Sequence, residues 1–304
     1  MPRIIVRTVY GADLQTARHL GRPHQIQPYS TINEALVDSQ VIPFLPTPIT
    51  VGMEVTAPFV SVDDSAALKL QVFCIGNGAH VNVAGPVGGI PTTRGVPHKA
   101  SDSGLYHQIP FVVRPVANDL DQSTRAKYRL RRTIVIGGAL HVAYYGKVLD
   151  FSTVLTEKLL LTTTNGVTTS SPFVPTINNL RPVQPPANSV VTGTFLEVSA
   201  GTEIPFTAEE VLWLREACLA LFGSEDYAII SEIALCSGVD KAVTARYPAV
   251  GPQTAAPVTA GLFEVVACQV NTFITTHHSM IYSNGGLDLG FDVGATEPLF
   301  GNNL

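Results

Sequence analysis

The residues best suited to metal or catalytic chemistry in this 304-residue chain are two adjacent histidines, His277 and His278. They follow LFEVVACQVNTFITT (262–276), whose alternating apolar residues predict a strand. Neighbouring side chains on a strand point to opposite faces, so the two imidazoles cannot easily share one ion. No third ligand stands at a recognised metal-site spacing. We therefore expect a structural or surface role for both.

A glycine-rich stretch, IGNGAH (75–80), follows an apolar run and contains a Gly-x-Gly pattern. A dinucleotide-binding fingerprint also needs a third glycine and a following helix, whereas Val81 stands at the glycine position. We interpret the stretch as a β-turn. The sequence holds no nucleophile-elbow, zinc-protease, phosphate-loop or EF-hand motif. We predict no catalytic residue, no cofactor and no metal site, and hence a protein that is not an enzyme.

Five basic residues form a local cluster: Arg125, Lys127, Arg129, Arg131 and Arg132. Three interpretations are open: a solvated sheet end with ordinary ion pairs, a contact to an acidic rim on another subunit, or a contact to a phosphate backbone. The net charge of −5 argues against a dedicated nucleic-acid binder. We take the five as candidate subunit-contact residues. Replacing Arg129 and Arg131 by Glu should then leave the monomer folded but weaken subunit association.

The segment that positions this cluster, Lys127–Asp150, predicts a β-hairpin. Two runs rich in β-branched and aromatic residues flank Gly137-Gly138, and a Gly-Gly pair can take the positive φ angles of a two-residue turn. The turn sets the expected cross-strand pairs as Ile136 with Ala139, Ile134 with His141, and Arg132 with Ala143.

One helix is clearly signalled after Phe206. Thr207 is placed as its N-cap, Glu210 completes a capping box, and Gly223 stands where a left-handed C-cap is expected. The next segment, YAIISEIALCSG (227–238), fits either a second helix antiparallel to the first or a strand. The Gly-rich tail from Asn284 predicts a loosely packed or partner-docked terminus.

The composition favours strands and turns. Charged residues make up 14 % of the chain, against a typical value of about 25 %, and there are 25 Gly and 22 Pro. We predict a mainly β fold with a minor helical part (α+β): a β-sandwich or barrel-like core with long Pro-rich arms and one or two helices. A surface with so little charge is suited to being covered by partners.

Proline-rich segments suggest how the chain is divided. Residues 42–50 and 168–188 cannot be central strands, since proline removes backbone donors, so both should be extended arms. We expect a β-rich domain (1–167) containing the hairpin, a Pro-rich linker or arm (168–200), and a helix pair with a C-terminal strand and Gly-rich tail (201–304). The alternative is one integrated domain.

The four cysteines lie far apart without Cys-x-x-Cys spacing, and we interpret them as reduced, mostly buried thiols. No signal-peptide core follows Met1, and no apolar run approaches 18 residues. The expected product is made in a cytoplasm and is neither secreted by a signal peptide nor membrane-spanning.

In this combination of low charge, Thr/Val/Gly/Pro-rich strands, Pro-rich arms and one well-capped helix, the chain resembles structural proteins of tailed-bacteriophage virions, of the neck, head–tail connector or tail type. The segment STRAKYRLRRTIVIGGALHVAYYGKVLDFS (123–152) is the most similar part. The resemblance implies a non-enzymatic virion subunit that assembles with itself, as a ring, and with other virion proteins, without nucleic acid or membrane. The alternatives are a capsid decoration or minor coat protein, and a β-sandwich hydrolase or carbohydrate-binding module with a site around His277, His278 and Asp288.

Overall fold

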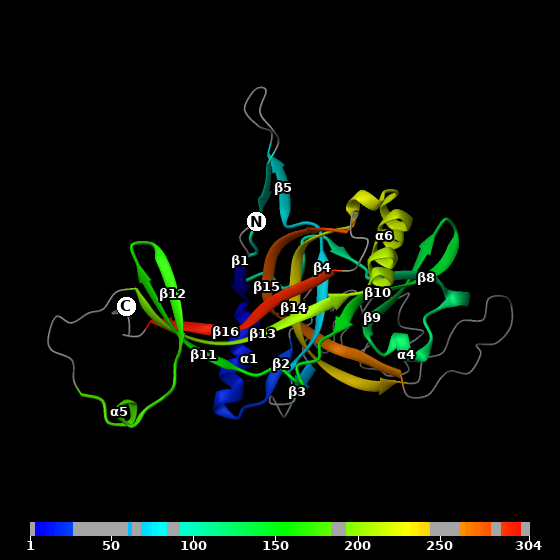
Figure 1. Ribbon diagram of the computed structural model, residues 1–304. Coiled ribbons are helices and arrows are strands. Elements are labelled where there is room, and N and C mark those ends of the chain that lie inside the picture. Colours follow the sequence, from blue (N-terminus) through cyan, green and yellow to red (C-terminus); the bar gives the residue numbers. More distant parts are fainter. Residues whose placement is uncertain are drawn as a thin grey trace. The chain divides into compact units, whose positions relative to one another are not determined.

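The computed structural model describes residues 4–26, 60–62, 68–83, 92–183, 193–243, 262–280 and 287–298. Contacts divide the chain into two units, Met1–Leu149 with Phe206–Leu287, and Asp150–Pro205 with Asp288–Leu304. Antiparallel strands dominate both (Figure 1), which confirms the predicted mainly β class with a minor helical part. The unit boundaries differ from the expected 1–167, 168–200 and 201–304, because a hairpin runs across residue 167. The expected arm at 42–50 lies outside the described residues.

The first unit is built on an eight-stranded antiparallel sheet. Its order is β1-β15-β14-β4-β10-β8, with β7 also paired to β4 and β9 to β10. The strands are β1 (Ile4–Arg7), β4 (Leu70–Gly76), β7 (Gln108–Ile109), β8 (Val112–Pro115), β9 (Tyr128–Ile136), β10 (Ala139–Val148), β14 (Ile229–Val243) and β15 (Leu262–Ser279). Two short ladders accompany it: β2 (His24–Ile26) with β3 (Val60–Val62), and β5 (His80–Val83) with β6 (Thr92–Gly95).

The β9–β10 hairpin follows the predicted register. Ile136 pairs with Ala139, Ile134 with His141 and Arg132 with Ala143. Gly137 and Gly138 take φ angles of 56° and 81°, which are cheap for glycine and strained for other residues. The hairpin prediction is therefore confirmed, including its turn.

Most of segment 227–238, from Ile229 on, is a strand. A short 3-10 turn, η4 (Glu225–Tyr227), leads into β14, which pairs with β4 on one side and β15 on the other. The expected helix pair is wrong here. A strand inside a sheet, covered on both faces, needs a nearly continuous apolar run, and such a run can be mistaken for a helix. Every described side chain from Ile230 to Ser237 is buried.

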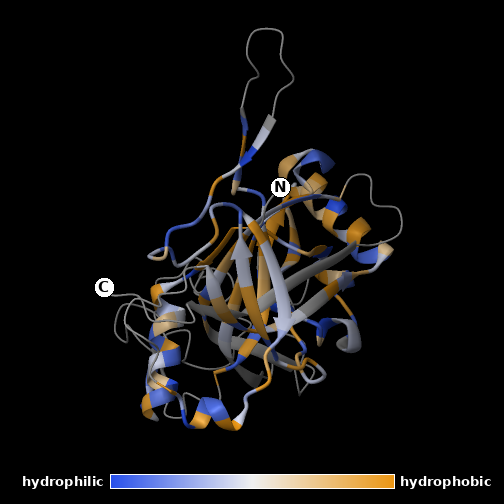
Figure 2. Cartoon of the chain, turned by 60° about the vertical axis from the view of Figure 1, so that its left-hand side comes forward, coloured by the Kyte–Doolittle hydropathy of each residue, from blue (hydrophilic) through white to orange (hydrophobic). Residues whose placement is uncertain are grey.

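The helix α6 (Ala208–Phe222) has the predicted ends. Thr207 and Glu210 form the capping box, and Gly223 closes the helix at φ 79°. A second helix, α1 (Val9–Leu20), has no counterpart among the elements predicted from the sequence. Its signals are a Thr8 N-cap and a left-handed Gly21 C-cap. Hydrophobic and hydrophilic residues mix along the helices (Figure 2), which is typical of half-covered elements.

Short connecting elements complete the first unit. The turn η3 (Val116–Asn118) and helix α4 (Gln122–Arg125) carry the chain from β8 into β9. Asp121 caps α4 by accepting from the amides of Ser123 (2.9 Å) and Thr124 (3.1 Å). None of the helices in the described part of the chain is long and apolar enough to cross a membrane.

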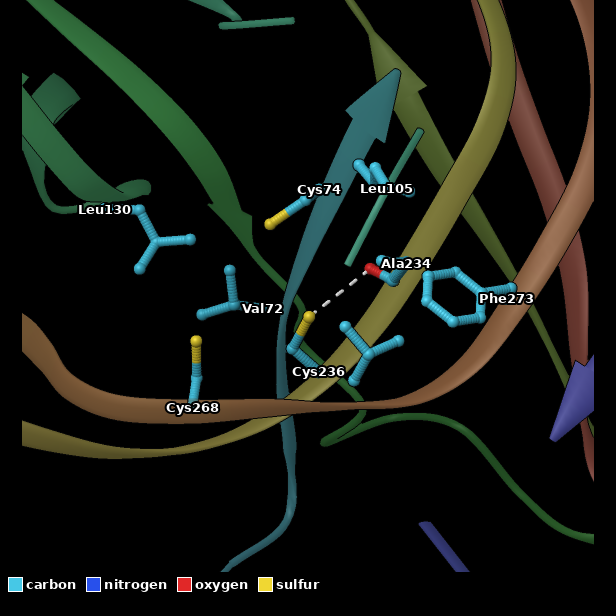
Figure 3. Packing of buried hydrophobic residues seen from close by; sticks show 9 residues of the cluster. Val72, Cys74, Leu105, Leu130, Ala234, Cys236, Cys268 and Phe273 are labelled. Atoms are coloured by element: carbon cyan, nitrogen blue, oxygen red, sulfur yellow. Dashed lines mark hydrogen bonds between the residues drawn. The ribbon is translucent and has the colours of Figure 1, made fainter. Parts of the chain in front are cut away.

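Buried side chains from several strands form one core cluster in this unit (Figure 3). It includes three of the cysteines, Cys74, Cys236 and Cys268, and the fourth, Cys218, is also buried and reduced. Burial raises the pKa of the Cys218 thiol to about 12. The expected reduced, buried thiols are confirmed, and such thiols pack as small apolar side chains.

The second unit contains a four-stranded sheet of order β12-β11-β13-β16. Its elements are β11 (Glu157–Thr164), β12 (Val167–Pro172), the short helix α5 (Ile177–Leu180), β13 (Thr194–Phe206) and β16 (Leu287–Pro298). Because β16 joins this sheet, these residues are not a loosely packed tail, while the alternative of a partner-docked terminus stays a prediction. The amide of Phe173 donates to Lys158, so the nitrogen of Pro172 faces away from β11, where a missing N–H is tolerated at an open edge.

Candidate functional site

Glu232, near the start of β14, is a fully buried carboxylate that accepts four hydrogen bonds. Its Oε1 accepts hydrogen bonds from the amides of Gly78 (2.9 Å) and His107 (2.8 Å). Its Oε2 accepts from the amide of Tyr106 (2.9 Å) and from Nε2 of His98 (2.7 Å). Burial alone would raise the pKa of Glu232, but the hydrogen bonds from His98 and the three amides outweigh it and hold that pKa below its ordinary value.

The His98 ring has contacts on both of its faces and at both of its nitrogens. Its ring lies flat between the rings of Tyr106 and Phe273, with centroids 4.1 Å and 3.9 Å away. Its Nδ1 is 3.3 Å from Oδ2 of Asp102, which also accepts the amide of Lys99 at 2.9 Å. Each ring nitrogen of His98 therefore lies within hydrogen-bonding distance of a carboxylate oxygen, and these two contacts fix the imidazole between Glu232 and Asp102.

Both positions of the Gly-x-Gly pattern require glycine, because a side chain there would collide with Glu232 or with residues beside it. A Cβ on Gly76 would collide with Oε1 of Glu232 and with the carbonyl of His107. A Cβ on Gly78 would lie 2.6 Å from Cβ of Tyr106. The pattern therefore lets three backbone segments close around Glu232, as expected for a bend rather than a nucleotide loop.

We call Glu232, His98 and Asp102 the Glu232 cluster. Both oxygens of Glu232 are already used by internal donors, and the side chain is fully buried. The arrangement can hold the segments 76–79 and 98–107 against the sheet, and its groups face protein rather than a substrate. Sequence reasoning missed it, although a lone Glu inside the apolar run of β14 was a usable signal.

The predicted basic cluster is gathered at one end of the hairpin but turned largely inward. Arg131 donates from Nε (3.1 Å) and Nη2 (3.0 Å) to Oδ2 of Asp119. Oδ1 of the same carboxylate accepts the hydroxyl of Tyr144 at 2.7 Å. Burial, opposed by the neighbouring Arg125, raises the pKa of Tyr144. Arg131 thus has an internal ionic partner.

The other four basic residues differ in exposure. Arg125 and Arg129 are buried, and Nη1 of Arg129 donates to the carbonyls of Ala126 and Tyr128, both at 2.8 Å. Arg132 is half-buried, and Lys127 is exposed. The role of these residues in subunit contacts stays a prediction, and Lys127 is the exposed member of the cluster.

A second ion pair joins the hairpin to α6. Nζ of Lys147 lies 2.8 Å from Oε1 of Glu210, which also accepts the hydroxyl of Tyr128 at 2.9 Å. Burial lowers the pKa of Lys147, partly offset by its hydrogen bond to Glu210. Glu210 therefore caps the N-terminus of α6 and also binds Lys147 and Tyr128 of the hairpin.

His277, the first of the two adjacent histidines, lies beside His80. The ring of His277 is 5.4 Å from that of His80, and the Nδ1 atom of each is buried without a hydrogen-bond partner. Burial and then the neighbouring His80 lower the pKa of His277. Across the described ranges, no three or more His, Cys, Asp or Glu side chains gather to hold a metal ion. The side chain of Asp288 lies outside the described set.

A model of the family described as "Family of unknown function (DUF7208)" matches residues 56–304. No curated protein and no solved structure matches the chain significantly.

Proposed function

We propose that this chain, which belongs to the DUF7208 family, is a non-enzymatic structural subunit that acts by assembling with copies of itself. The observation that carries the proposal is a concentration of solvent-exposed apolar side chains in the second unit. Six large apolar side chains there have exposed fractions between 65 % and 89 %: Leu155, Val167, Val174, Ile177, Leu180 and Val183. Six such side chains exposed within 29 residues of sequence support a role in protein–protein contacts.

The composition of residues 159–183 supports the proposed self-assembly. From Leu159 to Val183 the only charged residue is Arg181. Native edge strands are usually protected by charges, whereas every residue of β12 is exposed and uncharged. An uncharged strand with apolar residues beside it is suited to burial against another protein.

The resemblance to tailed-phage neck, connector or tail proteins supports placing this subunit in a virion. The proposed partners are further copies of the chain and other virion proteins. A capsid decoration or minor coat protein is the nearest alternative, and it would use the same apolar surface. A hydrolase or carbohydrate-binding module is less favoured, since the Glu232 cluster and Asp119 already have internal hydrogen-bond partners.

The test is the absolute mass of the purified full chain in solution, followed by electron microscopy of the same sample. We expect rings or other defined oligomers. Ile177→Ser with Leu180→Ser should lower the oligomer fraction, whereas Leu20→Ser, at an isolated exposed position at the end of α1, should not. A wild-type chain that stays monomeric at high concentration, alone and with virion proteins, would refute self-assembly.

A further inference from the structure

His80, the first residue of β5, and His277, near the end of β15, form a pair outside the Glu232 cluster. Their ring centroids lie 5.4 Å apart, with an angle of 73° between the ring planes. Both side chains are half-buried. Within the described part of the chain, the Nδ1 atom of each ring is buried and has no hydrogen-bond partner. Since buried polar atoms nearly always have a partner, two such nitrogens on neighbouring rings point to a bound ligand.

The backbone beside His80 is tied to the main sheet. The amide of Ala79 donates to Oγ of Ser231 at 3.0 Å, and the amide of Gly78 donates to the Glu232 carboxylate at 2.9 Å. Ser231 lies at an irregular step of the β14–β15 ladder, opposite residues 276–277. These contacts fix the start of β5 next to the part of β15 that carries His277. A ligand shared by the two rings therefore has little further ordering to impose on the chain.

The separation of the two rings matches that of two imidazoles on one metal ion. A tetrahedral ion bound by two imidazole nitrogens at about 2.1 Å sets the ring centroids roughly 5 Å apart. Imidazole is a good ligand for the divalent ions of zinc, copper, nickel and cobalt, whereas magnesium and calcium prefer oxygen ligands. An edge-to-face contact between the rings would account for their packing but would leave both Nδ1 atoms without a partner.

We propose that His80 and His277 hold one divalent transition-metal ion such as Zn²⁺, with Nδ1 of each ring as the ligand atom. Water or an outside group completes the coordination sphere. The ion joins the β5–β6 ladder to β15, and it stabilises the chain because the site exists only in the folded state. The sequence gave no sign of it, since the two histidines lie far apart in the chain. The site is independent of the proposed self-assembly, because one chain supplies both histidines.

The experiment titrates the full chain, purified without a histidine tag, with ZnCl₂ in a calorimeter and with CoCl₂ by visible absorption. We expect one ion per chain and no binding of MgCl₂. Loss of an outer partner of a metal ligand already costs about 10–100-fold in affinity, so His80→Gln and His277→Gln should each weaken binding by at least about tenfold. Zn²⁺ should raise the unfolding temperature of the wild type and of neither variant.

The matched control is His141→Gln, which replaces another half-buried histidine and should bind Zn²⁺ like the wild type. Circular dichroism checks that all three variants are folded, and imidazole NMR of the wild type, which needs no variant, should show Zn²⁺ shifting the signals of two histidines. A wild type that binds neither ion, histidine variants that bind normally, or an equal loss in His141→Gln would overturn the proposal. Binding is measured per chain, so a monomer that binds Zn²⁺ would refute self-assembly alone, and an oligomer that binds none would refute the metal site alone.

Discussion

Replacing Glu232 by Gln tests whether the buried carboxylate holds the surrounding segments in place. The two side chains have nearly the same shape, but one acceptor oxygen becomes an NH₂ donor. On either oxygen the new donor faces two donors: the amides of Gly78 and His107, or the amide of Tyr106 and Nε2 of His98. At least one buried backbone amide then loses its acceptor, and the partner of His98 changes from a carboxylate to a neutral amide.

The expected loss is large for a change of this size. Each buried donor left without an acceptor costs roughly 1–3 kcal/mol, and the loss of a hydrogen bond to a charged carboxylate costs roughly 1.5–3 kcal/mol. These effects overlap, so we expect Glu232→Gln to lower the free energy of unfolding of the first unit by about 4 kcal/mol. Glu216→Gln, on the exposed side of α6, should change it by less than about 0.5 kcal/mol.

The dependence on pH supplies an independent check. The pKa of Glu232 is lowered in the folded chain from its ordinary value of 4.5. A lowered carboxyl pKa contributes stability that is present above the ordinary value and is lost as the pH falls through the folded value. The advantage of the wild type over Glu232→Gln should therefore be constant between neutral pH and about pH 5, and should shrink at lower pH.

Urea unfolding followed by the fluorescence of the single tryptophan, Trp213, measures the difference, and hydrogen exchange locates it. The amides of Gly78, Tyr106 and His107 should exchange faster in Glu232→Gln, while those of β11 and β12 in the second unit should not change. A loss below about 1 kcal/mol with unchanged exchange at these three amides would show that the carboxylate is not needed to hold the segments.

Three further changes test the hairpin, its ion pair and the helix cap. Gly138→Val places a β-branched residue at φ 81°, so we expect a loss of at least about 1–2 kcal/mol in a denaturant titration; an unchanged midpoint would contradict the turn. Arg131→Glu should cost about 3–5 kcal/mol of stability, because it sets a second carboxylate against Asp119. We therefore expect local unfolding, whereas the sequence alone led us to expect that charge reversal here leaves the monomer folded. A native circular dichroism spectrum of the variant would argue against local unfolding. Thr207→Ala removes the capping acceptor of α6 and should cost about 1 kcal/mol by thermal or urea unfolding, with no loss expected for the exposed Thr169→Ala.

Local signals were enough to predict several elements. Gly137-Gly138 between two β-branched runs determines the β9–β10 turn and its register, because few other residue pairs accept two positive φ angles. Thr207, Glu210 and Gly223 determine both ends of α6, because caps act within one helical turn. The same kind of signal stands at Thr8 and Gly21, which cap the two ends of α1.

Only the tertiary structure decided what depends on partners distant in sequence. The run at 227–238 became a strand because β4 and β15 cover its two edges, and no local pattern separates a buried strand from a buried helix. Arg131 could not be recognised as buried, since its partner Asp119 reaches it only through the fold. The Glu232 cluster joins residues more than one hundred positions apart, and its chemistry arises from burial, which a sequence does not display.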